Sequence, residues 1–381
     1  MQSGRVFGLS MGHFFNDMYV GFLAPLLPLL IDRLGISLTL AAALASILSI
    51  STSLAQPAFA FVADKIRRPY MVVLGPLMTA IFFSAIGLVQ SYGMLIVIIV
   101  LGGIGTAAFH PQAAAYAGKS SGRQSGTAMS IFVTGGSAGY YTGPIVIMAI
   151  VTWLGIEYSF ISILPGVLIS AVLFLVLPKL PHAPNQHANV HGHVVIPHQI
   201  RALVILYLIS MIRSFMISGF NTFIPIYLEQ QDVDPMLYAA ALTSFGMPGA
   251  VGSLMGGALS DRFGRRTMIF SSITIAIPFF AAFLVLDGFL SIVMLGIAGF
   301  AIFSSIPVVI IMAQELMPTR INFVSSLVMG LSWGVAGILV TPLGAIAERV
   351  GISQALFGLI SLGVLASILT FFLPETKGAK K

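Results

Sequence analysis

Apolar residues follow one another along the chain in runs that are long enough to cross a lipid bilayer, and short polar segments separate these runs. A helix that crosses the bilayer needs about 20 mostly apolar residues. The pattern therefore predicts twelve membrane-spanning helices. We expect the first six at residues 6–31, 38–63, 69–89, 92–117, 125–149 and 153–177, and the last six at 201–228, 235–259, 267–286, 289–313, 321–347 and 352–374.

The segment 178–200 separates the two sets of helices. It is rich in Pro, His and Asn and has no helical period, so we expect a cytoplasmic linker between an N-terminal bundle, 1–177, and a C-terminal bundle, 201–381. The second set repeats the first, because a shift of about 197 residues brings Asp64 onto Asp261. Parallel repeats of six helices occur in transporters whose halves are related by an axis along the membrane normal.

The composition excludes a soluble domain. Of the 381 residues, 57% are hydrophobic and only 8% are charged, whereas soluble domains carry about 25% charged residues. The mean hydropathy of +1.01 leads to the same conclusion. We therefore predict an all-α membrane protein with two pseudo-symmetric six-helix bundles, whose surface faces the lipid bilayer.

The basic residues predict the orientation of the chain in the membrane. Both termini lie on one side of twelve spans, and of the 18 Lys and Arg residues only Arg33 and Arg349 fall in loops of the opposite side. Cytoplasmic loops carry the excess of basic residues. We therefore expect a bacterial-type inner-membrane protein with both termini in the cytoplasm. The net charge of +6 belongs to these loops, so we expect no nucleic-acid partner.

Several other functions lack the residues that they require. The chain has no cysteine, and no cysteine metal site or disulfide can form. No H-E-x-x-H or P-loop pattern occurs, and we expect no enzyme and no cofactor. The linker histidines match no defined metal-site spacing, and we expect no metal there. These histidines are His182, His187, His191, His193 and His198.

The loop between the eighth and ninth predicted helices has the sequence G-A-L-S-D-R-F-G-R-R over residues 257–266. It resembles the G-x-x-x-D-R-x-G-R-R signature of the major facilitator superfamily, with Gly257 letting the helix ends approach closely. A first-half copy over 60–68 is one residue shorter and lacks a glycine. The resemblance implies a latch that closes one face of a transporter. The residues that we expect in the latch are Asp64, Arg68, Asp261, Arg262, Arg265, Arg266, Glu315 and Arg320.

A second motif lies in the fifth predicted helix. The residues Gly139-Tyr-Tyr-Thr-Gly143-Pro144 resemble the antiporter signature G-x-x-x-G-P of proton-driven drug exporters. Small residues four apart let two helices touch. We expect Gly139, Gly143 and Pro144 to take part in gating, at the seam between the two halves.

Two further stretches resemble the fosmidomycin-resistance efflux family. One is H-x-x-N-D at 13–17, which continues into F-L-A-P-L-L-P at 22–28, and the other is G-T-A-A-F-H-P-Q at 105–112. This resemblance implies export of a small antibiotic-like or metabolite compound. The segments 315–320 and 374–378 instead resemble loop motifs of sugar and metabolite porters.

Asp17, His13 and His110 are ionisable residues that fall well inside predicted spans of the first half. An ionised side chain at membrane depth costs about 2.5–3.5 kcal/mol on insertion scales, so such residues are rare and tend to be functional. Asp17 lies near mid-bilayer in the first span, and His13 precedes it by one helical turn on the same face. His110 lies in the fourth span, just before Pro111. Histidine suits proton exchange near neutral pH, and we predict that Asp17, His13 and His110 couple transport to protons.

Arg213 lies inside the seventh span, and the shift of about 197 residues places it on Asn16, next to Asp17. We expect Arg213 and Asp17 to face each other across a central cavity. The planar guanidinium suits carboxylate or phosphonate groups of a substrate, and a structural ion pair is the alternative. Further candidates for substrate contact are Asn16, Asn221, Gln112, Gln314, Tyr116, Tyr140 and Tyr141.

The sequence thus predicts a secondary active transporter that exports a small molecule in exchange for protons by alternating access. We expect the protein to act as a monomer. One alternative is a proton-coupled symporter that imports a sugar or an organic anion. Another is a membrane sensor that binds its ligand and transports nothing.

Overall fold

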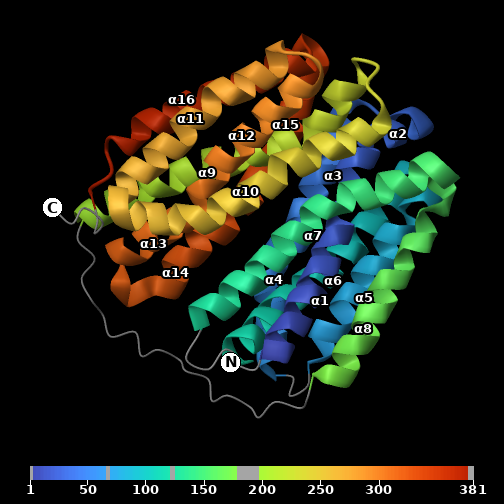
Figure 1. Ribbon diagram of the computed structural model, residues 1–381, viewed down its shortest axis with the longest axis horizontal. Helices are drawn as coiled ribbons and strands as arrows, with labels where there is room; N and C mark the ends of the chain where they lie inside the picture. The colour runs from blue at the N-terminus through green and yellow to red at the C-terminus, as the bar shows by residue number, and fades with distance from the viewer. Residues whose placement is uncertain (1–2, 66–68, 121–124, 178–196, 376–381) are drawn as a thin grey trace. The chain divides into compact units, whose positions relative to one another are not determined.

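The computed structural model describes residues 3–65, 69–120, 125–177 and 197–375, and helices make up nearly all of these ranges (Figure 1). The helices of the first half are α1 (Ser3–Val20), α2 (Leu23–Leu34), α3 (Leu38–Ser49), η1 (Ile50–Leu54), α4 (Gln56–Lys65), α5 (Tyr70–Ser84), η2 (Ala85–Leu88), α6 (Tyr92–Ser120), α7 (Ser125–Leu154), η3 (Ile156–Ser162) and α8 (Ile163–Val176). Those of the second half are α9 (Pro197–Glu229), α10 (Pro235–Phe263), α11 (Arg265–Val285), α12 (Gly288–Ser304), α13 (Ile306–Leu316), η4 (Pro318–Arg320), α14 (Ile321–Ser326), η5 (Leu327–Leu331), α15 (Ser332–Val350) and α16 (Ile352–Thr370).

The all-α membrane fold is confirmed. Within the described ranges, 11 helical stretches are long and apolar enough to cross a membrane. The remaining predicted span, 235–259, corresponds to α10, which has 29 residues. A helix of that length extends about 43 Å, so it can cross the bilayer. Its many Gly, Ala and Ser residues make it less apolar than the other stretches.

The described chain forms two compact units, which we call unit 1 and unit 2. Unit 1 contains α1 to α8 together with residues 228–243, and unit 2 contains residues 197–227 and 244–375. The predicted linker, 178–200, lies outside the described residues except for its last four, which begin α9 at Pro197.

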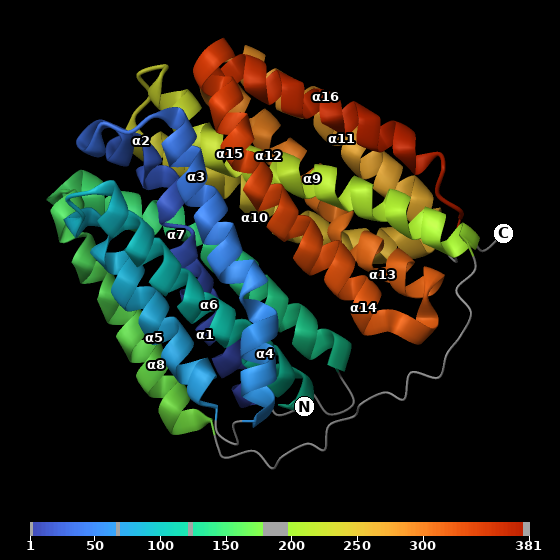
Figure 2. The same cartoon turned by 180° about the vertical axis from the view of Figure 1, so that it is seen from behind.

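Helix α1 holds unit 1 together. It packs against α5, α6, α7 and α8, and α5 also packs against α6 and α8 (Figure 2). The buried side chains Leu9, Phe109, Phe132 and Leu173 come from four of these helices and form one apolar cluster. In a membrane, close packing of this kind and not exclusion of water holds helices together.

The contact between α1 and α7 depends on glycine. A Cβ atom on Gly139 or Gly143 would overlap the backbone carbonyl oxygen of Phe14 or Met18, and a Cβ on Gly136 would overlap the His13 ring. These glycines therefore let two helix backbones touch. The sequence prediction placed Gly139 and Gly143 at the seam between the halves, whereas the structure places them against α1 within unit 1.

The first predicted span, 6–31, divides into α1 and α2 at residues 21–22. Pro25 has no N–H, and its ring clashes with the carbonyl of the residue four before it, which is Gly21. The Phe22 N–H therefore donates to the Tyr19 carbonyl at 3.1 Å, in a tighter turn than the α-helix has. Gly21 also lies directly against the Tyr140 carbonyl, where no Cβ would fit.

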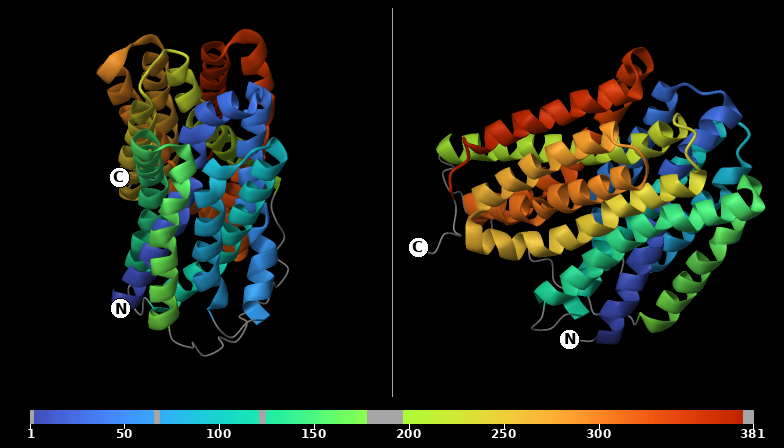
Figure 3. Two further views of the ribbon diagram at one scale, coloured as in Figure 1. Left: turned by 90° about the vertical axis from the view of Figure 1, so that its right-hand side faces the viewer. Right: turned by 45° about the horizontal axis from the view of Figure 1, so that its top comes forward.

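In unit 2, α11 packs against α12 and α16, and α15 also packs against α16 (Figure 3). Gly252 and Gly256 let α10 touch the carbonyl oxygens of Phe300 and Ser304 on α12. The prediction that Gly257 lets the helix ends approach closely was wrong, since a Cβ on Gly257 would meet nothing within 4 Å. Gly256, one position earlier, faces α12 instead.

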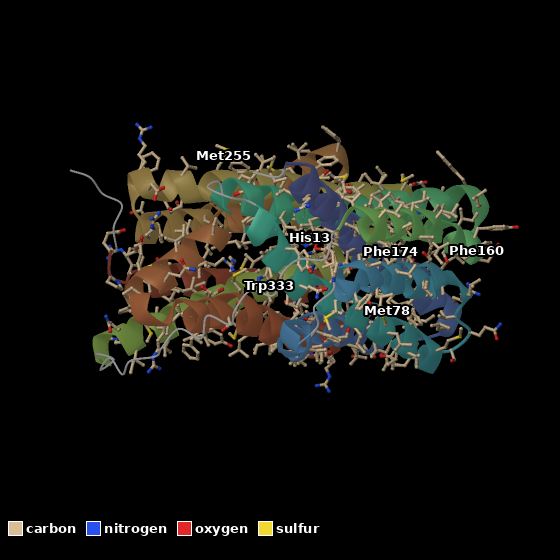
Figure 4. All side chains as sticks on the ribbon, turned by 90° about the horizontal axis from the view of Figure 1, so that it is seen from below. His13, Met78, Phe160, Phe174, Met255 and Trp333 are labelled. Carbon is tan, nitrogen blue, oxygen red and sulfur yellow. The ribbon has the colours of Figure 1, made fainter. Side chains whose placement is uncertain are left out.

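Large apolar side chains remain on the outside of the molecule. Phe160 and Phe174, which Figure 4 labels, are 47% and 66% exposed. Exposed aromatic and aliphatic side chains on a helical bundle suit contact with lipid.

We predict that Gly139→Ala destabilises the protein. The added methyl group overlaps backbone atoms of Phe14, which cannot shift without moving helix α1. Overpacking of this kind costs about 1–3 kcal/mol. Thermal unfolding of the purified protein in detergent measures the change as a lower midpoint temperature. The matched control is Gly8→Ala on α1, where the added Cβ meets nothing within 4 Å and the midpoint should not fall. Equal midpoints for the two variants would contradict the close contact.

Candidate functional site

In unit 1, His13 and His110 both contact the carboxylate of Asp17. The His13 Nε2 atom lies 3.1 Å from Oδ2 of Asp17, and the His110 Nε2 atom lies 3.1 Å from Oδ1 of the same residue. The two Nε2 atoms are 3.1 Å apart. We call His13, Asp17 and His110 the triad. Its side chains are only 10%, 18% and 23% exposed, in that order.

The helices bring the triad together by simple geometry. His13 and Asp17 are four residues apart on α1, so they lie on one face of the helix. His110 comes from α6, which packs against α1. The predicted proton-coupling residues therefore meet at one point, as Figure 4 shows for His13 among the helices of unit 1.

Each histidine ring has a second partner on its other nitrogen. The His13 Nδ1–H donates to the Phe132 carbonyl on α7 at 2.8 Å, and the two rings stack with centroids 4.2 Å apart. The His110 Nδ1 atom lies 3.3 Å from Nε2 of Gln56 at the start of α4. Neither Phe132 nor Gln56 is among the residues predicted from the sequence. The one signal for Gln56 is its amide side chain in a predicted span whose other polar residues are Ser and Thr.

Asn16 lies behind the triad. Its side chain is fully buried, its Nδ2 donates to Asp17 Oδ1 at 2.9 Å, and its Oδ1 accepts from the Thr79 hydroxyl at 3.1 Å. This amide therefore ties the carboxylate to α5 and restrains its orientation. Contact of Asn16 with a substrate stays a prediction.

The other candidates of unit 1 lie in different surroundings. Gln112 is buried, and its Oε1 accepts at 3.1 Å from the Val72 N–H in the first turn of α5, which also donates to the Pro69 carbonyl at 3.1 Å. Tyr116 belongs to the apolar cluster. Tyr140 and Tyr141 contact each other with ring centroids 4.9 Å apart, and the Tyr140 phenol interacts electrostatically with Asp17.

Arg213 is the most deeply buried charged residue named so far. Only 2% of it is exposed, and its Nη2–H donates to the Ser210 hydroxyl at 3.2 Å. Its Nε and Nη1 atoms have no hydrogen-bond partner among the described residues. Asn221 is buried on the same helix, and Gln314 donates to the Ser325 hydroxyl at 2.9 Å. Arg213 belongs to unit 2 and Asp17 to unit 1, so their pairing stays a prediction.

The latch of unit 2 centres on Arg265. Its guanidinium pairs with Asp261 at 2.6 Å and with Glu315 at 3.2 Å, and it donates to the Ser260 hydroxyl at 2.5 Å. Gly264 between α10 and α11 has φ of 93°, which an L-residue rarely adopts. The sharp turn at this glycine brings Arg265 back onto Asp261.

The remaining predicted latch residues have other surroundings. Arg266 donates from its backbone N–H to the Glu375 carboxylate at 3.3 Å, a partner that the sequence analysis did not name. Arg262 lies over the Phe263 ring at 5.4 Å, and Arg320 is exposed in η4. Arg68 and the side chain of Asp64 lie outside the described residues.

The triad also has the composition of a metal site. Among the described residues, only these three form a group of His, Cys, Asp or Glu whose donor atoms all lie within 4.8 Å of one another. Two imidazole nitrogens and a carboxylate suit Zn²⁺ and related ions. The hydrogen bonds to the other ring nitrogens decide whether a metal or a proton suits the site better.

Membrane-spanning helices, an internal repeat and a cluster of buried ionisable side chains define a polytopic membrane transporter. The sequence pattern of the Major Facilitator Superfamily matches residues 9–341. The chain belongs to this superfamily, whose members are transporters and not enzymes.

Relatives and solved structures agree with this assignment. The chain is 26% identical to the fosmidomycin resistance protein of Escherichia coli strain K12, over 98% of this chain and 93% of the relative. It is 24% identical to the multi-drug resistance efflux pump PmrA of Streptococcus pneumoniae serotype 4, over 68% of this chain and 67% of the relative. A bacterial homologue of the human lysosomal transporter Spinster, inward-facing and unoccupied, has the same fold, with a TM-score of 0.79 at 16% identity and coverage of 97% and 96%.

We predict that Arg265→Ala destabilises unit 2. The variant leaves Asp261 and Glu315 without their common cation and the Ser260 hydroxyl without a donor, and because Asp261 is 69% exposed we expect a loss of about 1–2 kcal/mol. Thermal unfolding in detergent measures it. Arg262→Ala is the matched control, since this neighbouring arginine is exposed and surface substitutions change stability by less than about 0.5 kcal/mol. The same midpoint for both variants would show that the latch adds no stability.

Proposed function

We propose that this transporter exports a small molecule in exchange for protons and that the triad is its proton site. The observation that supports the proposal is the contact of two imidazoles with one partly buried carboxylate, at 3.1 Å each. Carboxylates and imidazoles inside membrane bundles form proton relays in pumps and transporters. Imidazole is also the side chain that changes its charge between pH 5 and 8 without a special environment.

Export is supported by the relatives. One of them is named for resistance to fosmidomycin and another for multidrug efflux. The excess of basic residues in one set of loops supports an orientation with both termini in the cytoplasm. We propose that the protein works as a monomer in a bacterial-type inner membrane, with its two six-helix halves alternating about a midplane site.

The exchange requires that proton and substrate exclude each other. We propose that protonation of the triad releases the substrate from Arg213, and that the substrate binds again only after the proton has left, so that the two ligands compete. A ligand shifts a conformational equilibrium only by its difference in affinity for the two states, so Asp17 must face each side of the membrane in turn.

The sign of a pH change distinguishes exchange from co-transport. Purified protein is reconstituted in vesicles that contain a pH-sensitive dye, the membrane potential is clamped, and fosmidomycin or another candidate compound is added outside. Exchange moves protons out as the compound enters, so the interior becomes more alkaline. Co-transport makes it more acidic. Both signs are independent of the orientation of the protein in the vesicle. Binding of the compound without any flux would indicate a sensor.

We predict that Asp17→Asn abolishes the compound-dependent pH change, because an amide cannot carry the proton. The matched control is Asp287→Asn, the same chemical change at an exposed position before α12, which should retain the pH change. Compound-dependent proton flux that persists in the Asp17 variant would refute the triad as proton site.

We predict that Arg213→Gln weakens transport of anionic compounds. A hydrogen bond to a charged group contributes about 1.5–3 kcal/mol, so we expect KM to rise about 10–100-fold with little change for neutral compounds. Arg213→Lys keeps the charge but loses the planar fork, and its KM should lie in between. An unchanged KM for anions in Arg213→Gln would assign Arg213 a structural role.

A further inference from the structure

The partners of the triad fix where its hydrogen atoms lie. A backbone carbonyl only accepts hydrogen bonds, so His13 must carry a hydrogen on Nδ1, 2.8 Å from the Phe132 oxygen. If the His13 ring is neutral, its Nε2 then has a lone pair that points toward Asp17.

The second ring has the opposite arrangement. Gln56 Nε2 lies 2.9 Å from the Thr52 carbonyl oxygen, so this atom must be the amide nitrogen and a donor. The same NH₂ group lies 3.3 Å from Nδ1 of His110. It can donate one hydrogen to each partner, and His110 Nδ1 must accept. A neutral His110 therefore carries its hydrogen on Nε2, which lies 3.1 Å from both Asp17 Oδ1 and His13 Nε2 and can donate toward either atom.

These assignments determine how many protons the triad needs. With Asp17 ionised and both rings neutral, the His13 Nε2 lone pair would face the Asp17 Oδ2 anion at 3.1 Å, which is repulsive. One added proton at this contact makes it an attractive hydrogen bond and makes the cluster neutral. A second would have to go to His110 Nδ1, where it meets the Gln56 NH₂ group. The conformation therefore fits one added proton, shared by His13 Nε2 and Asp17 Oδ2.

The same hydrogen bonds disfavour a metal ion. The three contacts of 3.1 Å in the triad are close to the donor spacing of roughly 3.3 Å that follows from tetrahedral zinc with bonds of about 2.0 Å. A metal would need a lone pair on Nε2 of both rings, with each Nδ1–H donated to an acceptor. Phe132 supplies that acceptor for His13, but Gln56 presents a donor to His110.

We propose that Gln56 is a specificity-determining residue that makes the triad a site for one proton, and not for a divalent metal ion, by holding His110 in the Nε2–H tautomer. The inference rests on the proposed role of the triad, but its test involves no transport. Among the described residues, the titratable groups that interact with Asp17 are His13 and His110 of the triad and Tyr140 on α7.

The first experiment reads the tautomers directly. Of the seven histidines, five are replaced by glutamine in the full-length chain, which leaves His13 and His110. The replaced residues are His182, His187, His191, His193 and His198. Nitrogen NMR of the histidine-labelled protein then shows which ring nitrogens carry hydrogen, and His110→Gln assigns the signals. We expect hydrogen on Nδ1 of His13 and on Nε2 of His110. Hydrogen on Nδ1 of a neutral His110 would overturn the proposal.

The second experiment uses Zn²⁺ as the probe in the same background. Gln56→Glu presents a carboxylate to His110 Nδ1–H and completes the set of acceptors that metal-binding histidines need. Such second partners change metal affinity about 10–100-fold, so we expect Zn²⁺ affinity by calorimetry to rise at least tenfold, and Asp17→Asn in that variant to remove the gain. Gln314→Glu is the matched control for an added carboxylate and should give no gain.

The outcomes separate this proposal from the proposed function. Zn²⁺ binding to the unchanged triad as tight as in Gln56→Glu would overturn the role of Gln56 and leave the transport assay intact. The expected tautomers and zinc affinities, together with proton flux that persists in Asp17→Asn, would refute the proton-site function and leave the role of Gln56 in place.

Discussion

The arrangement of unit 1 depends on the electrostatic cost of a carboxylate buried in a membrane-spanning helix. Asp17 lies inside a bundle whose outer surface is suited to lipid, and water cannot stabilise its charge there as it does at a protein surface. The surroundings offset this cost with hydrogen bonds from His13, His110 and Asn16, and each partner is fixed in turn by Phe132, Gln56 or Thr79. A buried polar network is stable only when nearly all its members are satisfied. The network is therefore sensitive to a single proton, since adding or removing one changes a hydrogen bond into a repulsive contact.

Close helix packing makes that network possible. The side chains of the triad are short, so α1 and α6 must lie close together for the 3.1 Å contacts to form. Helix α7 must also lie close to α1, because its Phe132 carbonyl accepts from His13. The glycines of α7 let its backbone touch that of α1, and Gly136 leaves the space that the His13 ring occupies. The antiporter-like motif at Gly139 and Gly143 thus supports the triad through packing within unit 1. A substitution there would disturb the triad without touching any of its atoms.

Much of the fold and part of the site follow from the sequence. Span length, the internal repeat and the latch motif predict the helices well, because each depends on local pattern. The pair of His13 and Asp17 is also local, since one helical turn separates them. The contact of His110 with Asp17 depends on which face of α6 packs against α1, and the sequence alone does not show which face that is. For the same reason the sequence does not show that Gly256, and not Gly257, meets the neighbouring helix, or that Asn16 and Gln112 bond to neighbouring helices. Phe132 acts through its backbone carbonyl, which every residue has, so no sequence pattern could have indicated it.

The internal repeat shows how the two halves differ at matched positions. The shift that superposes the signature loops places Arg213 on Asn16, so related helices carry an amide in one half and a guanidinium in the other. In unit 1 the amide supports a carboxylate that its own bundle already neutralises. In unit 2 the guanidinium is buried with one hydrogen bond, and two of its nitrogens have no partner among the described residues. An unpaired buried cation is costly, and its cost falls when an anion binds. Under the proposed function, unit 1 binds the proton and unit 2 binds an anionic group of the substrate, so the two repeated halves hold different ligands, as exchange requires.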